Sequence, residues 1–261
     1  MGSSNSCVFL IELNEMNLDF LSFYARHGRA PMLADLIRKH GVSETSSEFE
    51  YEKLEPWIQW VTAHTGMSFD EHRVFRLGDI VEHDFLQIWE WLERQGLTVG
   101  AISPMNARNR SLRPAFFIPD PWTPEPPTAR PVLKKMFDAI RQAVNDNAQA
   151  RLTFGSFAWL VAGFVRYARP ANYTKYLSLL FSAARKPWRR AMFLDLLLSD
   201  VFIREASGAN LGFGSVFFNA GAHIQHHYLF NSPAYEGEQS NPDWYVGEEQ
   251  DPVGEVCELY D

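Results

Sequence analysis

The sequence has little cysteine and comparatively little positive charge. Its two cysteines, Cys7 and Cys257, exclude a disulfide framework and a zinc site built from cysteine ligands. So few thiols are typical of a reducing compartment, and we therefore expect a cytoplasmic protein. The 24 Lys and Arg residues stand against 32 Asp and Glu, and the net charge of −8 argues against a general nucleic-acid binder.

A long apolar run is also lacking. Residues 1–6 are polar and carry no secretory signal pattern. The most apolar stretch, residues 152–168, is short and contains Arg166. We therefore expect a buried or surface-docking helix there and no transmembrane segment. With 46% hydrophobic residues, the 261-residue chain can bury a substantial core, as one large domain or a core with a small insertion.

What the sequence does contain is an alternation of strand-like and helix-like segments. Short apolar runs predict buried strands at residues 7–13, 97–102 and 211–219. Because helical segments separate these runs, we expect an α/β fold with a mainly parallel sheet flanked by helices. We assign residues 1–128 to the first part of this core, residues 129–206 to a helical cap insertion, and residues 207–261 to a return to the core.

The middle of the chain predicts the cap. The proline-rich segment 119–127 excludes regular structure and marks the border of the insertion. Residues 129–206 are then almost wholly helical in pattern, with breaks at Pro170 and Pro187. Apolar residues occupy most faces of these helices. The helices therefore either bury one another or cover a substrate with an apolar portion, such as a lipid-linked phosphate.

Three histidines form the strongest local signal for chemistry: His223, His226 and His227. Residues three and four apart share one face of a helix, so the three imidazoles can point into one metal site. The same spacing suits a polar helix start whose histidines only form hydrogen bonds. His226 is the best single candidate for a metal ligand.

A second polar cluster, Glu12, Asn14 and Glu15, ends the first predicted strand. Carboxylate and amide oxygens bind hard cations, so all three are candidate metal ligands. The alternative is that Asn14 caps a turn and Glu15 interacts with a helix N-terminus.

The third cluster lies on and after the helix that begins at Pro56. Glu55 precedes this helix, at an end where a phosphate is also favoured, and Gln59 lies one turn further on. We take Glu55 and Thr65 as candidate catalytic residues and Gln59 and His72 as candidate substrate-binding residues. The alternative is a capped helix with two packing tryptophans.

Taken together, these segments resemble a known family in order and spacing. The matching motifs are Leu13-Asn14-Glu15, Pro31 to Leu36, Gly41-Val42, Thr65-Gly66, His72-Arg73-Val74 and Phe217 to Leu229. Their succession resembles the alkaline phosphatase superfamily, in its branch of type I phosphodiesterases and nucleotide pyrophosphatases. The resemblance covers roughly residues 7–105 and 211–261, and the helical middle matches only as a cap insertion.

The resemblance implies a metal-dependent hydrolase with two zinc or manganese ions and a Thr or Ser nucleophile. It places His226 as a metal ligand. It also places Asn14 and Ala222 where the family has metal-binding Asp residues, and Pro56 where it has the nucleophile. No Asp-His-Gly motif, which carries further ligands in the family, occurs in this sequence. The nucleophile and several ligands are therefore not matched.

Two functions follow from this pattern. The first is hydrolysis of phosphate or sulfate esters, phosphodiesterase-like, on a small-molecule or a lipid- or sugar-linked phosphate ester. The second is a non-catalytic relative, or a C-terminally truncated fragment, that serves as a binding or scaffold domain. For the hydrolase we expect Glu12, Asn14, Glu55 and His226 to share one cleft at the carboxyl edge of the sheet.

Overall fold

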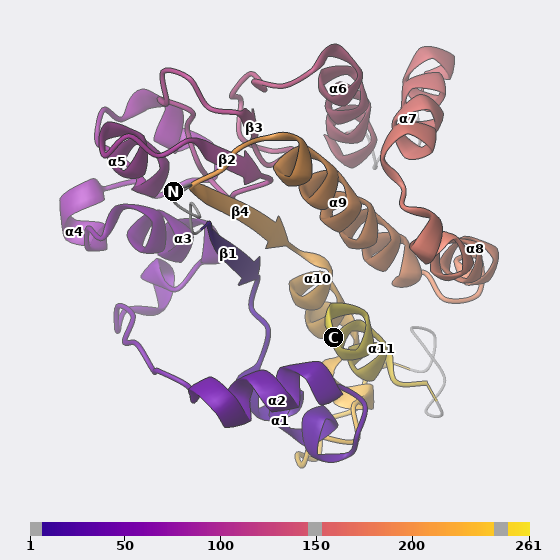
Figure 1. Ribbon diagram of the computed structural model, residues 1–261. Coiled ribbons are helices and arrows are strands. Elements are labelled where there is room, and N and C mark those ends of the chain that lie inside the picture. Colours follow the sequence, from indigo (N-terminus) through magenta and orange to yellow (C-terminus); the bar gives the residue numbers. More distant parts are fainter. Residues whose placement is uncertain (1–6, 146–152, 243–249) are drawn as a thin grey trace. The chain divides into compact units, whose positions relative to one another are not determined.

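The computed structural model describes residues 7–145, 153–242 and 250–261 (Figure 1). The chain divides into two compact units. Unit 1 comprises Met1–Glu12, Ser47–Arg169 and Leu197–Phe217. Unit 2 comprises Leu13–Ser46, Pro170–Leu196 and Phe218–Asp261.

A four-stranded parallel sheet organises unit 1, so the predicted α/β class is confirmed (Figure 1). The strand order is β1-β4-β2-β3. The strands are β1 (Val8–Leu13), β2 (Val99–Ile102), β3 (Phe116–Ile118) and β4 (Phe213–Phe218). Gly100 of β2 pairs with Phe116, and a Cβ on Gly100 would lie 2.6 Å from the Phe116 ring. Only glycine leaves room for that ring at the centre of the sheet.

The first strand differs from the prediction of a buried strand. Val8, Phe9 and Ile11 of β1 are exposed, whereas every residue of β2, β3 and β4 is buried. The reason is the strand order, which places β1 at an edge of the sheet with β4 as its one neighbour. An apolar run alone does not distinguish an edge strand from a central one.

Helices α3 (Pro56–Thr65), α4 (Phe69–His72) and α5 (Ile88–Arg94) also belong to unit 1. Helix α3 begins with proline in its first turn and ends at Gly66, which has a left-handed backbone with φ of 72°. Trp89 of α5 is completely buried and packs against residues of β2, β3 and β4. Its indole N–H donates to the Ser215 hydroxyl at 2.9 Å, so the largest core side chain has no unsatisfied polar atom.

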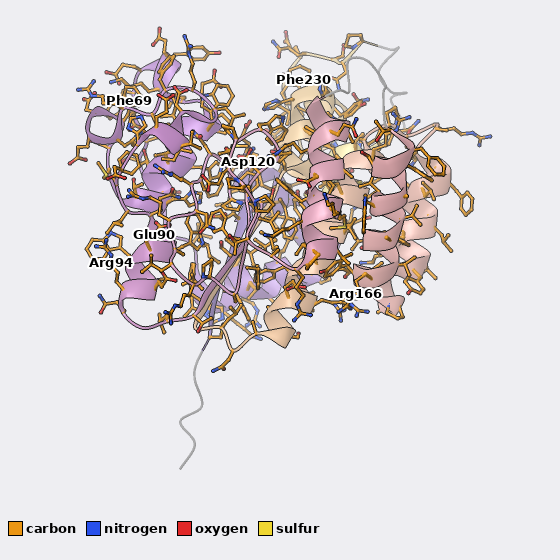
Figure 2. The ribbon with its side chains drawn as sticks, turned by 90° about the horizontal axis from the view of Figure 1, so that it is seen from above. Phe69, Glu90, Arg94, Asp120, Arg166 and Phe230 are labelled. Carbon is orange, nitrogen blue, oxygen red and sulfur yellow. The ribbon has the colours of Figure 1, made fainter. Side chains whose placement is uncertain are left out.

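Two buried carboxylates fix the loops of unit 1 (Figure 2). Glu90 accepts the backbone N–H groups of Gln87 at 2.7 Å and Arg110 at 3.0 Å. Asp120 accepts the N–H of Asn106 at 2.8 Å and both the N–H and the hydroxyl of Thr123. Burial raises the pKa of both carboxyl groups, and these hydrogen bonds oppose the rise. Both residues therefore stabilise the fold.

The middle of the chain is helical, as expected. Its helices are α6 (Pro131–Asn145), α7 (Phe154–Tyr167), α8 (Tyr173–Ser182) and α9 (Arg189–Gly208). The predicted breaks at Pro170 and Pro187 fall between α7 and α8 and between α8 and α9. Within unit 1, α6 and α7 lie side by side (Figure 1), and a Cβ on Gly163 would lie 2.2 Å from the Met136 sulfur. The assignment of residues 129–206 as a cap over the sheet stays a prediction.

Unit 2 contains α1 (Leu18–Arg26), α2 (Pro31–His40), α10 (Ala220–Tyr228) and α11 (Pro252–Tyr260). The Asn17 side chain accepts the backbone N–H groups of Asp19 and Phe20 and thereby caps the N-terminus of α1. The polar segment before α11 is rich in turn-forming residues, which predicts a long loop over residues 231–251, and residues 243–249 of it lie outside the described residues. None of the helices in the described ranges is both long and apolar enough to cross a bilayer.

Candidate functional site

Two glutamates, Glu12 near the end of β1 and Glu15 just after it, are each hydrogen bonded to a histidine. In unit 1, Oε1 of Glu12 lies 2.7 Å from Nε2 of His64. In unit 2, Oε2 of Glu15 lies 2.5 Å from Nε2 of His226. The sequence predicted both glutamates and His226 as metal ligands. His64 was not singled out, because one histidine on a helix gives no local signal.

The pair of Glu12 and His64 is sealed inside unit 1. Both side chains are fully buried, and the imidazole ring lies 4.8 Å from the Trp89 ring. Among the described residues, Oε2 of Glu12 and Nδ1 of His64 have no hydrogen-bond partner. A substrate cannot approach a pair with so little exposed surface. The contact instead links β1 to α3, across 52 positions of the sequence.

The pair of Glu15 and His226 is open to solvent. The His226 side chain is 58% exposed and the Glu15 side chain 32% exposed. Glu15 has a left-handed backbone with φ of 51°, which non-glycine residues seldom adopt. Gln225 supports this conformation, because its amide donates to the Glu15 carbonyl at 2.8 Å and its oxygen accepts the Asn17 N–H at 3.2 Å. Backbone strain held in this way occurs preferentially at functional sites.

Asn14 joins the carboxyl ends of β1 and β4. Its backbone N–H donates to the Phe218 carbonyl at 3.0 Å, and its side-chain amide donates to Oδ1 of Asn219 at 2.8 Å. The side chain is buried. Because α10 begins directly after Asn219, this hydrogen bond holds the start of α10 next to the loop that carries Glu15.

The N-terminus of α10 is held by a buried carboxylate from α9. Asp195 accepts the backbone N–H of Ala220 at 2.7 Å and that of Asn219 at 3.3 Å. The Tyr260 hydroxyl donates to Asp195 at 2.8 Å and accepts the Gly221 N–H at 2.8 Å. Burial raises the pKa of Asp195 to about 6, although these hydrogen bonds oppose the rise. Asp195 was missed because a lone Asp in an apolar helix gives no motif.

The three histidines of α10 are all exposed, as a shared helical face requires. The rings of His223 and His227 lie 5.0 Å apart, and His226 points to Glu15. Lost hydration, and then repulsion from His227 and His226, lower the pKa of His223. Across residues 7–145, 153–242 and 250–261, no group of three or more His, Cys, Asp or Glu side chains is arranged to hold a metal ion. The zinc or manganese ion stays a prediction.

The two candidate catalytic residues of unit 1 lie at opposite ends of α3. Glu55 is exposed at the N-terminus of α3, and its side chain forms no capping hydrogen bond. The Thr65 hydroxyl donates to the Val61 carbonyl at 2.7 Å and accepts the Met67 N–H at 3.1 Å. That hydroxyl is therefore engaged with the backbone at the end of the helix.

The candidate substrate-binding residues also make contacts within unit 1. The Gln59 amide donates to Glu48 at 2.6 Å and to the Lys53 carbonyl at 2.7 Å. Nδ1 of buried His72 accepts the Val74 N–H at 3.0 Å. The proton of its ring therefore lies on Nε2, 3.1 Å from the Thr62 hydroxyl. Burial lowers the pKa of His72.

Glu12 and Glu55 belong to unit 1, and Asn14 and His226 belong to unit 2. A common cleft for these four residues stays a prediction. Within unit 2, the described contacts bring together Asn14, Glu15 and the start and middle of α10. Comparison of the chain with models of protein families, with curated proteins and with solved structures gives no match.

Proposed function

We propose that this chain hydrolyses phosphate or sulfate esters, with His226 as the general base and Glu15 as the carboxylate that orients it. The observation that supports this proposal is the hydrogen bond between the two side chains. A carboxylate only accepts hydrogen bonds, so Nε2 of His226 carries the proton and Nδ1 keeps its lone pair. An exposed imidazole oriented in this way is suited to removing a proton from water.

The chemistry needs one water molecule and one ester. Nδ1 of His226 takes a proton from the water, and the water oxygen attacks phosphorus or sulfur. The bond to the leaving oxygen breaks, and the imidazolium returns the proton to that oxygen. Glu15 stabilises the imidazolium between the two proton transfers. The left-handed backbone of Glu15 keeps its carboxylate in place, because Gln225 binds the Glu15 carbonyl.

A metal ion would supply further charge stabilisation to such a reaction. The described side chains do not fit this role as they stand, because they assemble a glutamate–histidine pair and no group of three potential ligands. Elemental analysis of the purified chain after incubation with zinc or manganese tests the metal prediction separately.

The proposal is tested by hydrolysis assays on the whole chain. The substrates are p-nitrophenyl phosphate, its bis(p-nitrophenyl) diester and p-nitrocatechol sulfate, each with and without added zinc or manganese. We expect His226→Ala to lower kcat on the preferred ester by about 10²- to 10⁴-fold, the range for loss of a general base. Glu15→Gln should give a smaller loss, because the imidazole remains but loses its orienting anion.

The matched control is His40→Ala, which removes an exposed histidine from the end of α2 in the same unit. It should leave kcat unchanged. A His226→Ala variant that folds normally by circular dichroism and retains the wild-type rate would contradict the proposal. So would a wild-type chain that hydrolyses none of the three esters.

A binding role without catalysis is the second candidate. It is favoured because the hydroxyl groups of Thr62 and Thr65, which follow the family's nucleophile position, are both engaged in other contacts. The Thr62 hydroxyl lies against His72, and that of Thr65 binds the backbone of α3. This candidate predicts that a phosphate ester raises the melting temperature of the chain without being hydrolysed.

A further inference from the structure

Helix α7 of unit 1 exposes a broad apolar face. Phe154 is 88% exposed and Val165 71% exposed, and Phe157 and Val161 between them are also exposed. These four residues recur three or four positions apart, so they lie on one side of the helix. The opposite side packs against α6 through Gly163. The side of α7 that faces away from its own unit is therefore strongly apolar.

Helix α8 of unit 2 repeats this arrangement. Its exposed apolar side chains are Tyr173, Leu177, Leu180 and Phe181, the last of which is 80% exposed. They recur at the spacing of one helix face, and Tyr176 and Leu179 are buried on another. Single exposed apolar residues are normal on a protein surface, but two helices with contiguous apolar faces mark binding surfaces.

The sequence segment that contains these helices carries charge of one sign, although Glu205 contacts Tyr167 of α7 and Glu255 and Glu258 lie beside α8. Residues 147–194 contain eight Lys and Arg and no Asp or Glu, whereas the rest of the chain holds the remaining 16 Lys and Arg and all 32 acidic residues. Lys186 and Arg189 are paired with Glu255. The exposed cations Lys175, Arg185 and Arg190 make no ion pair within the ranges that the structure describes. Arg166, at the end of α7, is exposed as well (Figure 2).

We propose that α7 and α8 each carry a separate surface that binds an anionic lipid bilayer, with the apolar face of the helix among the acyl chains. The combination of aromatic and aliphatic side chains with unopposed Lys and Arg is that of an interfacial helix. The absence of acidic residues from segment 147–194 matches the negative surface of such a bilayer. A partner protein with an ordinary mixed surface would not require so long an acid-free segment. This inference does not depend on the proposed hydrolase.

The first test is co-sedimentation of the whole chain with lipid vesicles. Vesicles of phosphatidylcholine alone are compared with vesicles that also contain about 30% phosphatidylserine. We expect binding to the anionic vesicles and at least tenfold weaker binding to the neutral ones. Raising NaCl from about 0.1 M to about 0.5 M should weaken the binding, because salt screens the attraction between the cations and the lipid headgroups.

Variants then separate the contribution of the apolar side chains to vesicle binding from that of the cationic side chains. Val165→Asp in α7 and Phe181→Asp in α8 should each lower the partition coefficient about tenfold or more, because each removes a large apolar side chain from the interface. Replacing Arg185 and Arg190 together with Glu should lower binding to anionic vesicles by a similar factor. Binding to neutral vesicles should not change with the second substitution.

The matched control is Phe49→Asp, because Phe49 is 97% exposed but lies between Glu48 and Glu50. It should bind vesicles as the wild type does. Equal binding to neutral and anionic vesicles, or equal losses in Phe49→Asp and Phe181→Asp, would overturn the proposal. A wild-type chain that ignores vesicles but forms a dimer that Phe181→Asp dissociates, as measured by analytical ultracentrifugation, would assign the face to a second copy instead.

Discussion

Replacing Asp195 with Asn should change how the stability of unit 2 depends on pH. The Asp195 carboxyl is buried among the N-terminus of α10 and the Tyr260 hydroxyl, and burial raises its pKa from 3.8 to about 6. A raised pKa in the folded state means that the folded chain holds this proton more tightly than the unfolded chain. Its stabilising contribution is therefore complete below the unfolded pKa and is lost as pH rises through about 6.

The size of the effect follows from the pKa difference. A rise from 3.8 to about 6 corresponds to about 3 kcal/mol of folding free energy in total, of which about 2.5 kcal/mol is lost between pH 4 and pH 7. The asparagine side chain of the variant does not titrate, and its amide oxygen can still accept the Ala220 N–H. The Asp195→Asn substitution should therefore lower the free energy of unfolding much less at pH 7 than at pH 4. The other carboxyl groups titrate in both proteins and cancel in the difference.

The assay is urea unfolding of the wild type and Asp195→Asn at several pH values between 4 and 7. The control is Asp35→Asn, which replaces an exposed carboxylate of unit 2 whose pKa is lowered by hydrogen bonds from Lys39 and Arg38. The free energy of unfolding of that variant should not rise relative to that of the wild type as pH increases. If the free-energy difference between the wild type and Asp195→Asn stays constant across this range, the buried carboxyl does not titrate as argued.

Two further substitutions test the packing of unit 1. Ser215→Ala should destabilise the fold by about 1–3 kcal/mol in urea unfolding, because it leaves the buried indole N–H of Trp89 without its acceptor. Gly163→Leu should lower the melting temperature, with a cost of about 1–3 kcal/mol or more, because Met136 already occupies the space of a Cβ. Gly155→Ala on the same helix meets no close neighbour and should not destabilise the protein.

The sequence predicted the helix that begins at Pro56, the helical middle of the chain and the central strands, because their signals are local. Asn17 precedes α1 and caps it, and Gly66 ends α3 in a left-handed conformation. Strand β3 was not predicted, because three residues followed by a proline-rich segment are too short for a period to be recognised. The edge position of β1 was missed for another reason. It depends on the order of strands in the sheet, which no segment of the chain encodes by itself.

In the candidate site, too, the sequence predicted the features that have a local signal and missed those that depend on contacts between distant residues. Helical periodicity predicted that His223, His226 and His227 share a face, and all three are exposed on α10. It could not predict that Glu15 pairs with His226, because the two residues are 211 positions apart. That pairing depends on the left-handed backbone of Glu15 and on the hydrogen bonds of Gln225. Asp195 likewise acts on residues distant in sequence, through its contact with the start of α10.

Net charge predicted the electrostatics of this chain only at long range. A balance of −8 describes the field far from the molecule, where all charges contribute together. At physiological ionic strength, an interaction is screened beyond about 8 Å, so a surface in contact with the protein responds mainly to nearby charges. Along the segment that contains α7 and α8 the only charged residues are Lys and Arg, because no acidic residue occurs from position 147 to position 194. The acidic residues near it, such as Glu205 beside Tyr167 and Glu255 beside Arg189, come from other segments. A chain that is acidic as a whole can therefore present a basic and apolar surface to a lipid bilayer, and the order of residues determines this rather than their totals.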